Sequence, residues 1–587
     1  MAAGTSPPRS RPGRALALLA LFAPGFLLGV HLAGLLFFLN PELPFAVLPV
    51  ARAALVYGAL LGAASALVGL PLALRRPRRA IRFLPWGVTI ALALAAILDS
   101  AHASHFAFYL PPGINERLIK AALWMVLASL IAFYTALLHS LRHRRYGRRS
   151  RLAFWFLALV SVYLMVERRE AFTPRPDSAR PTGIEASQRP FLLVVGLDSA
   201  TLDALLPMAE EGRLPFFASL LRDGAYGRLG TFAPDRTPTV WATLATGKYP
   251  YKNGVVGNRA YPAPFVAPGA TLHLLPAGLG FERWGLFGKR GWLEEGGSAR
   301  RVRALWEILP KLGVSSGVVG WPATSATAPE PEFAFTDRFF GSSFRPDQAR
   351  PEPLAERAWI FRIGVGELDP RYRSRFAPVT PPAVLRALAL DVWRESLTRF
   401  LDQQQEARAV FLRLPGLAVA SKRYFGGYSE YRFAAHHAPA FERSAAALGA
   451  YYAQLDSMLS DLWGQIDGPR LLAVVSGSGA NEPGWLTRAW LTVRGRPAVG
   501  GDLSGAPDGV VLLLGEGIRG DTLITGANLV DVAPTLLYGL GLPVARDLDG
   551  RVLTEAFSRG FLKQHPLTFV PSYETLETEP LRGTPPP

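Results

Sequence analysis

The chain has 587 residues, a formal net charge of +17 and no cysteine. The length allows several domains, and the missing cysteines exclude structural disulfides, thiolate metal sites and a cysteine nucleophile. A charge of +17 spread over a soluble domain would indicate nucleic-acid binding. However, residues 1–170 hold 19 Lys and Arg against 5 Asp and Glu, whereas the remaining residues hold 44 against 41. The basic charge therefore belongs to the N-terminal part, and we expect no nucleic-acid partner.

Long apolar runs fill that N-terminal part. They cover roughly 15–39, 53–74, 84–110, 118–140 and 152–167. Most are near the ~20 residues that a helix needs to cross a bilayer. They predict an all-α membrane domain of about five helices over residues 1–169, with the lipid bilayer as its partner. A cleaved signal peptide is the alternative for the first run, but that run is long and lacks a small-x-small cleavage site.

Arginines alternate between the loops that join these runs. They precede the first run and follow the second and the fourth: Arg9, Arg11, Arg14; Arg75, Arg76, Arg78, Arg79, Arg82; Arg142, Arg144, Arg145, Arg148, Arg149, Arg151. Basic loops mark the cytoplasmic side of a membrane protein. We therefore expect a multi-pass plasma (inner) membrane protein with a cytoplasmic N-terminus. Everything after about residue 170 is then expected to be periplasmic or extracellular.

The second half of the chain alternates apolar strands with helical segments. A linker rich in Pro, Ser and charge, residues 170–189, comes first. Strands are predicted near 191–195, 314–321, 407–414, 470–476 and 509–515. The pattern predicts an α/β domain over residues 190–557, built on a mostly parallel sheet sandwiched by helices. Insertions near 258–300 and 335–400 have no sustained period, and residues 558–587 are predicted to form a C-terminal tail.

Six segments of this domain carry a family resemblance. They are GLD (196–198), TFAPDRTPTVWATLATGKYPYKNGVVG (231–257), RALWEILPKLGVSSGVVGWPAT (303–324), ALGAYYAQLDSMLSDLW (447–463), GEGIRGD (515–521) and LVDVAPTLLYGLGLPVARDLDGRVL (529–553). In this order and spacing they resemble the type I phosphodiesterase/nucleotide pyrophosphatase branch of the alkaline phosphatase superfamily. The resemblance covers most of residues 190–555 and implies an alkaline-phosphatase-like fold. It also implies that the two insertions cap the active site, with plain surface loops as the alternative.

The resemblance implies a hydrolase in which a threonine hydroxyl at a helix N-terminus attacks phosphorus or sulfur. The matching position is Thr237, which is followed by Pro238. Two cations, usually zinc, would lower the pKa of that hydroxyl, and the helix N-terminus would favour the developing negative charge. A structural alternative stays open, because Thr before Pro is also a common helix cap.

The first metal site of the family is only half preserved. Its ligands would be Asp198, Thr237, and an Asp–His pair in a Ser-Asp-His-Gly turn. That turn matches the stretch LLAVVSGSGANEPGW (471–485) at Ser476-Gly477-Ser478-Gly479, so both ligands of the pair are missing. Another histidine, common in the family after the ATG turn, is replaced by Asn253.

The second metal site keeps none of its three ligands. An Asp and a His four residues apart match Ala418 and Lys422, and residues 500–507, where a later His is expected, contain none. Zinc normally needs about four donors. We therefore expect no metal cofactor, and Asp198 and Thr237 become vestigial ligands. His436 and His437 are the best candidates for rebuilt ligands, but adjacent side chains on regular structure point in different directions.

Lys422 places an ammonium where a histidine would have met a cation. Our hypothesis is that Lys422, together with Arg236, supplies fixed positive charge in place of the metal and binds ligand. Asp198 would then face Lys422, which would neutralise a carboxylate otherwise unpaired at the sheet edge. The alternative is that Lys422 points to solvent.

Two function classes remain open. The first is a membrane-anchored, catalytically degenerate phosphodiesterase-like protein that binds a phosphorylated or sugar ligand, a lipid-linked envelope component or a partner protein. The second is an active phosphoric-ester hydrolase or phospho-group transferase. The layout of about five spans before an outer domain also resembles the phosphoethanolamine and glycerol-phosphate transferases of bacterial envelopes, which need metal too.

Overall fold

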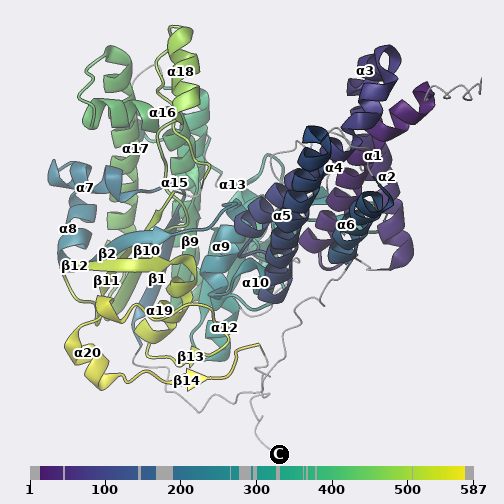
Figure 1. Ribbon diagram of the computed structural model, residues 1–587. Helices are drawn as coiled ribbons and strands as arrows, with labels where there is room; N and C mark the ends of the chain where they lie inside the picture. The colour runs from purple at the N-terminus through teal and green to yellow at the C-terminus, as the bar shows by residue number, and fades with distance from the viewer. Residues whose placement is uncertain are drawn as a thin grey trace, which may run out of the picture. The chain divides into compact units, whose positions relative to one another are not determined.

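The computed structural model of this chain divides into two compact units (Figure 1). The helical unit comprises Met1–Thr173 and Arg259–Glu294, and the sheet unit comprises Pro174–Asn258 and Glu295–Pro587. The structure describes residues 13–43, 46–142, 147–166, 189–264, 266–276, 293–294, 300–325, 331–360, 362–364, 366, 368–376, 380–505 and 507–574. The predicted linker, except its last residue, lies outside the described residues.

Four helices of the helical unit are long and apolar enough to cross a membrane. They are α1 (Arg14–Leu39), α2 (Val47–Val68), α4 (Pro77–His105) and α5 (Pro112–Leu141), and they match the first four predicted runs. The fifth run is also helical, as α6 (Arg148–Val166), but α6 is not among the four helices that are long and apolar enough to cross a membrane. A short helix, α3 (Leu70–Arg75), joins α2 to α4. The helices support membrane insertion, whereas their orientation across the bilayer stays a prediction.

Helices α1 and α2 pack closely because glycines line their contact. A Cβ atom at Gly29 would lie 2.2 Å from the carbonyl oxygen of Tyr57, and one at Gly25 would lie 2.3 Å from that of Leu61. Two glycines four residues apart are a common device for close helix approach in membranes, where small residues let backbones meet. Helix α4 is tied to α1 by a buried polar pair, since His31 Nε2 lies 2.9 Å from Asp99 Oδ1.

The first predicted insertion belongs to the helical unit rather than to the α/β domain. Its described part forms β3 (Arg259–Pro262), β4 (Thr271–Leu272) and β5 (Leu293–Glu294), in the order β4-β3-β5. Buried Asn40, after α1, holds it: Asn40 Oδ1 accepts from the amides of His273 and Leu274, at 2.7 and 3.0 Å. Asn40 Nδ2 donates to the Leu274 carbonyl at 2.8 Å. These hydrogen bonds between the Asn40 side chain and the backbone of the insertion explain why the insertion belongs to the helical unit.

The sheet unit is built on one nine-stranded sheet, in the order β12-β2-β11-β10-β1-β9-β6-β7-β8. The strands from β10 to β7 run parallel, and the sheet has antiparallel pairs at β10–β11, β11–β2 and β7–β8. In chain order they are β1 (Phe191–Leu197), β2 (Ala225–Gly230), β6 (Ser316–Trp321), β7 (Phe333–Thr336), β8 (Ala349–Arg350), β9 (Ala409–Leu414), β10 (Arg470–Ser476), β11 (Gly509–Gly515) and β12 (Thr522–Asn528). The predicted mostly parallel sheet is confirmed.

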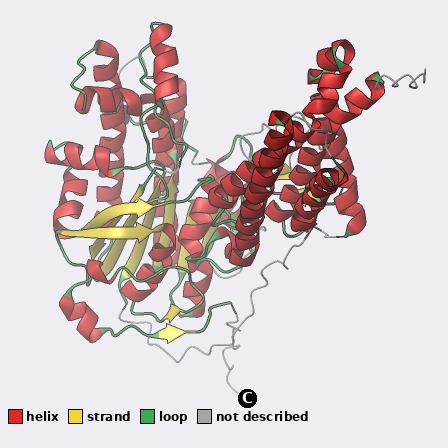
Figure 2. Cartoon of the chain, in the orientation of Figure 1, coloured by secondary structure: helices red, strands yellow, loops and turns green. Residues whose placement is uncertain are grey.

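Helices cover both faces of this sheet (Figure 2). Every residue of β1, β6 and β9 is buried, which explains why these strands read as continuous apolar runs. The helices are α7 (Leu202–Glu210), α8 (Pro215–Asp223), α9 (Thr237–Thr246), α10 (Pro250–Asn253), α12 (Leu305–Lys311), α13 (Glu352–Ile360), α14 (Pro370–Arg373), α15 (Pro382–Gln405), α16 (Gly416–Arg432), α17 (Pro439–Gly464), α18 (Trp485–Val493), α19 (Val532–Gly539) and α20 (Arg559–Gln564).

Two predicted boundaries differ from the structure. The second insertion, 335–400, contributes to the core: fully buried Trp393 on α15 belongs to the main hydrophobic cluster. The predicted tail contains α20 and a strand, β14 (Phe569–Val570), that pairs with β13 (Val544–Ala545). The fold therefore extends at least to Glu574. The last residues, 575–587, lie outside the described residues.

Candidate functional site

A cavity of about 260 Å³ lies at the carboxyl ends of the central strands. Strands β10, β1 and β9 are parallel neighbours, so the residues that follow them meet at one sheet edge. Asp198 and Ser199 follow β1, Gly477 and Ser478 follow β10, and Ala418 lies in the first turn of α16, after β9. The other lining residues are Asp235, Thr237, Val240, Trp241, Leu503 and Ser504.

The cavity brings together several positions matched to the family. Asp198 and Thr237 both line it, and so do Gly477, Ser478 and Ala418, which the resemblance matched to three ligand positions of the family. Arg236 and Lys422 do not. The order of the motifs along the chain therefore correctly indicated which of these residues lie together at this edge of the sheet. The roles assigned to Asp198 and Thr237 stay predictions.

The partner of Asp198 is Arg413, not Lys422. The Nε and Nη2 atoms of Arg413 lie 2.9 and 2.5 Å from the two carboxylate oxygens of Asp198. Both side chains are nearly buried, at 7% and 13% exposure. Lys422 is exposed on α16, one turn beyond Ala418. The predicted pairing was wrong because β9 lies next to β1, and Arg413 reaches Asp198 across the sheet edge.

More charged groups surround Arg413. Its guanidinium lies 5.3 Å from the ring centre of Trp241, and Trp241 packs edge-on against Trp321. Fully buried Asp391, on α15, accepts hydrogen bonds at 3.0 Å from the Gly416 amide and from the Tyr451 hydroxyl.

Burial sets the protonation of these acids. It raises the pKa of Asp391 to about 7, although Arg394 and the two hydrogen bonds act in the opposite direction. Burial also raises the pKa of Asp337, while the charges of Arg413, Arg338 and Arg394 lower it. Burial and the nearby arginines therefore act in opposite directions on the pKa of both acids.

The turn after β10, which the resemblance matches to two metal ligands of the family, is held by its own hydrogen bonds. The Ser476 hydroxyl donates to the Ser478 carbonyl at 2.7 Å and accepts from the Ala200 amide at 3.1 Å. A Cβ atom at Gly477 would lie 2.2 Å from Cγ1 of Val240 on α9. The space that an aspartate side chain would enter is filled by that valine, so the turn packs against the helix of Thr237.

Thr237 is the first residue of α9, and Arg236 occupies the N-cap position. Thr237 is exposed, which leaves its hydroxyl accessible from the cavity. Arg236 turns elsewhere and donates from Nη1 to the Val256 carbonyl at 3.0 Å. Asp235, two residues before Thr237, lines the cavity instead. No motif in the sequence singled out Asp235, although an acid beside the nucleophile position is a signal worth noting.

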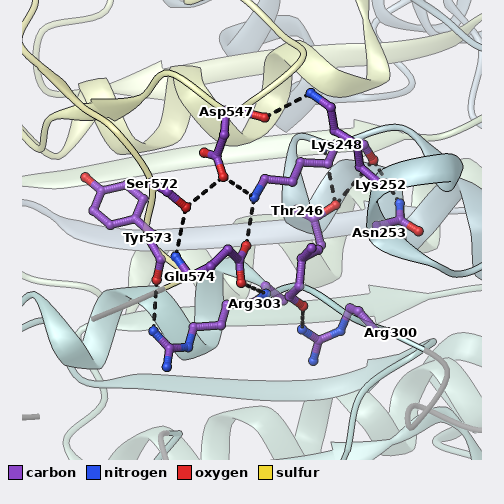
Figure 3. Close-up of polar contacts among 12 residues, drawn as sticks. Thr246, Lys248, Lys252, Asn253, Arg300, Arg303, Asp547, Ser572, Tyr573 and Glu574 are labelled. Atoms are coloured by element: carbon purple, nitrogen blue, oxygen red, sulfur yellow. Dashed lines mark hydrogen bonds and ion pairs between the residues drawn. The ribbon is translucent and has the colours of Figure 1, made fainter. Parts of the chain in front are cut away.

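Asn253, at a position where the family commonly has histidine, is fully buried. Its Nδ2 donates to the Lys248 carbonyl at 2.8 Å, and its Oδ1 accepts from the Val255 amide at 2.8 Å. Lys248 Nζ in turn lies 2.7 Å from both Asp547 and Glu574 (Figure 3). We define the Lys248 cluster as Lys248, Asp547 and Glu574. These contacts fix a turn to the C-terminal segment.

The donors present do not fit the two-metal centre of the family. The cavity offers two carboxylates and several hydroxyls, but no imidazole, and both oxygens of Asp198 already hold Arg413. Within the described ranges, no group of three or more His, Asp or Glu side chains is placed to hold a metal ion. His436 and His437 are exposed, and His436 lies 2.7 Å from Glu430 instead.

Comparison with known proteins agrees with this architecture. Residues 192–482 match the family model of type I phosphodiesterase/nucleotide pyrophosphatase. Similar solved structures include wild-type alkaline phosphatase PafA, with 12% identity and a TM-score of 0.40 over 64% of this chain and 100% of that chain. Phosphonoacetate hydrolase from Sinorhizobium meliloti 1021 has 15% identity and a TM-score of 0.32 over 50% of this chain and 57% of that chain. Phosphonate monoester hydrolase from Silicibacter pomeroyi has 14% identity and a TM-score of 0.34 over 62% of this chain and 76% of that chain.

No curated protein sequence matches the chain. The match to the family model spans the strands and turns that build the cavity, from β1 to the turn after β10. The resemblance drawn from the sequence motifs is therefore confirmed: residues 192–482 form a domain of the type I phosphodiesterase/nucleotide pyrophosphatase family, preceded by apolar helices that fit a membrane domain.

Proposed function

We propose that the sheet unit is a non-catalytic member of its family that binds a small hydroxylated ligand of the cell envelope. The observation that carries the proposal is the bidentate pair between Arg413 and Asp198. It puts a fixed cation against the carboxylate that the family uses as a metal ligand. A guanidinium neutralises that carboxylate, but it cannot offer an open coordination position to a reacting oxygen.

The lining of the cavity favours a sugar or polyol over a phosphate ester. Hydroxyl groups come from Ser199, Thr237, Ser478 and Ser504, and carboxylates come from Asp198 and Asp235. Such groups accept and donate hydrogen bonds to ligand hydroxyls, while Val240 and Trp241 give apolar contact. A phosphate would meet two carboxylates and no lining Lys or Arg. The phosphorylated ligand suggested by the family is therefore the weaker fit.

An active hydrolase or phosphotransferase is the second candidate. One observation favours it: Thr237 is exposed in the cavity at the N-terminus of α9, where partial positive charge gathers. That charge alone leaves the threonine hydroxyl a weak nucleophile, since activation normally needs an adjacent base or a metal ion.

The deciding experiment uses the full chain purified in detergent. We expect far less than one zinc or manganese ion per chain, and hydrolysis of nitrophenyl phosphodiesters that is unchanged by Thr237→Ala. Glucose or glycerol should raise the melting temperature more than inorganic phosphate does. Ala418→Trp fills the cavity and should abolish that shift, whereas Ala446→Trp, at an exposed site on α17, should preserve it. Stoichiometric metal with turnover that depends on Thr237 would establish the enzyme instead.

We also propose that the sheet unit faces the outer side of the plasma membrane. The support is the alternation of arginine-rich loops between the apolar helices. Because the chain has no cysteine, single-cysteine variants report accessibility without background. A membrane-impermeant maleimide applied to intact spheroplasts should label Lys563→Cys but not Arg78→Cys. Labelling of Arg78→Cys alone would reverse the orientation.

A further inference from the structure

A second, larger cavity of about 1100 Å³ lies within the helical unit. Helices α1, α4, α5 and α6 all contribute to its lining. Along α1 the lining runs from Leu19 to Val30, which spans about 16 Å at 1.5 Å per residue. The apolar part is rich in aromatic rings, with Phe22 stacked on Phe26 at 5.7 Å between ring centres. A long apolar trough of this size matches a lipid chain better than a compact solute.

One end of the cavity is basic. Arg82 near the start of α4, Arg151 near the start of α6, and His139 with Ser140 at the end of α5 all belong to the lining. Helices α4 and α6 begin where α5 ends, so these side chains gather at one end of the bundle. The described part of the lining contains no acidic residue. Among the described residues, neither Arg82 nor Arg151 forms an ion pair with an acidic side chain. The Ser150 hydroxyl lies 3.3 Å from His139 Nε2.

We propose that this cavity binds one anionic phospholipid. The phosphodiester of the lipid lies against Arg82 and Arg151, and an acyl chain follows α1 past Phe22 and Phe26. Arginine suits this task because its planar fork donates two parallel hydrogen bonds to a phosphate. Basic pockets between membrane helices bind lipid head groups in this manner. The site is separate from the cavity of the sheet unit and does not depend on the function proposed for it.

The chemistry of the two ends explains the choice of ligand. An apolar cavity open to a bilayer fills with hydrocarbon rather than water, because its walls offer water no partners. A head group without negative charge would gain no ionic contact with the two exposed guanidinium groups at the basic end. An inorganic phosphate would satisfy the arginines but leave the apolar trough empty. Only a molecule with both an anionic head and a long apolar chain uses the whole site.

The test is native mass spectrometry of the full chain in detergent, with phosphatidylglycerol, phosphatidylcholine and diacylglycerol offered in turn. We expect phosphatidylglycerol to bind most tightly. The double variant Arg82→Gln/Arg151→Gln should weaken phosphatidylglycerol binding about twenty-fivefold, roughly fivefold for each arginine, and should change diacylglycerol binding little. Both arginines are exposed side chains, so their replacement leaves the packed interior intact.

Two further variants make the result specific. Arg75→Gln/Arg76→Gln removes the same charge from the exposed junction of α3 and α4, outside the cavity lining, and should leave phosphatidylglycerol binding unchanged. Ala23→Phe/Ala158→Phe narrows the apolar trough and should weaken the binding of all three lipids to a similar extent. Equal losses in the two arginine double variants would reduce the effect to general surface charge and overturn the site. So would equal binding of phosphatidylglycerol and phosphatidylcholine to the wild-type chain.

Discussion

Lys248 and Arg413 are both nearly buried cations with carboxylate partners in the sheet unit, at 5% and 7% exposure. Lys248 meets Asp547 and Glu574, which lie about 300 residues further along the chain (Figure 3). Arg413 meets Asp198 across two adjacent strands, at the mouth of a cavity. The first pairing holds distant segments of the fold together, and the second sits where the family performs its chemistry.

The surroundings of the two pairs differ in a further respect. Around Lys248 the neighbours include backbone groups, a serine and a second lysine: Ser572 donates to Asp547, the Arg303 amide donates to Glu574, and Lys252 Nζ donates to the Asp547 carbonyl. Around Arg413 lie other buried charges, and Ser199 beside Asp198 holds a left-handed backbone with φ of 68°. Strained backbone and crowded charge are typical of functional sites. We therefore expect the neighbours of an ion pair, more than its burial alone, to distinguish a functional role from a structural one.

Loss of Lys248 should have the largest effect. Lys248→Met leaves two carboxylates facing each other without their cation, and we expect the sheet unit to lose about 3–5 kcal/mol of stability. Tryptophan fluorescence during thermal melting of the detergent-solubilised chain measures it. Lys563→Ala, at an exposed position, is the control. A melting temperature equal to that of the wild type would remove the structural role assigned to the Lys248 cluster.

The pH dependence of stability tests the buried charges near Arg413. Because burial raises the pKa of Asp391 to about 7, above its unfolded value, the folded state holds a proton that the unfolded chain has released between about pH 4 and 7. Stability from this group is therefore full below about pH 4 and declines as pH rises to about 7, by on the order of 4 kcal/mol.

Asp391→Asn imitates the protonated carboxyl group and should flatten that part of the curve. Melting temperature against pH is the measurement, with the exposed Asp467→Asn as control. Burial also raises the pKa of Glu395 to about 7, so part of the slope will persist in the variant. Parallel curves for the wild type and Asp391→Asn would contradict the assignment.

The smallest expected effect concerns the pair at the cavity. Arg413→Met and Asp198→Asn should each cost about 2–3 kcal/mol, because each leaves its partner charged and nearly buried. The double variant should cost about 2 kcal/mol less than their sum, since no lone charge remains. Purely additive losses in melting experiments would mean that the two side chains do not act as a pair.

The sequence allowed the sheet, its mostly parallel character and the cavity edge to be predicted, because these depend on local apolar runs and on the order of motifs. Asp198 and Thr237 reach one cavity for that reason. Arg413 was missed because one arginine in the strand AVFLRL looks like part of an apolar run. Only the strand order, with β9 beside β1, reveals its partner.

Long-range contacts account for the other differences. Residues 558–574 looked like a tail because nothing in their composition points to Lys248, which binds Glu574. The segment from Arg259 looked like a cap of the α/β domain because its hydrogen bonds to Asn40 join residues more than 230 positions apart. Motif spacing matched Lys422 to a ligand position, but it could not show that helix α16 carries the Lys422 side chain to solvent.

The contact between Gly477 and Val240 has a consequence for substitution. A carboxylate side chain does not fit at position 477 by one substitution, because its Cβ would overlap the valine methyl group. Shrinking Val240 first would open a void with no ligand to occupy it, so each step alone is unfavourable. The two positions are therefore coupled, and a side chain larger than glycine at position 477 requires a compensating change at Val240.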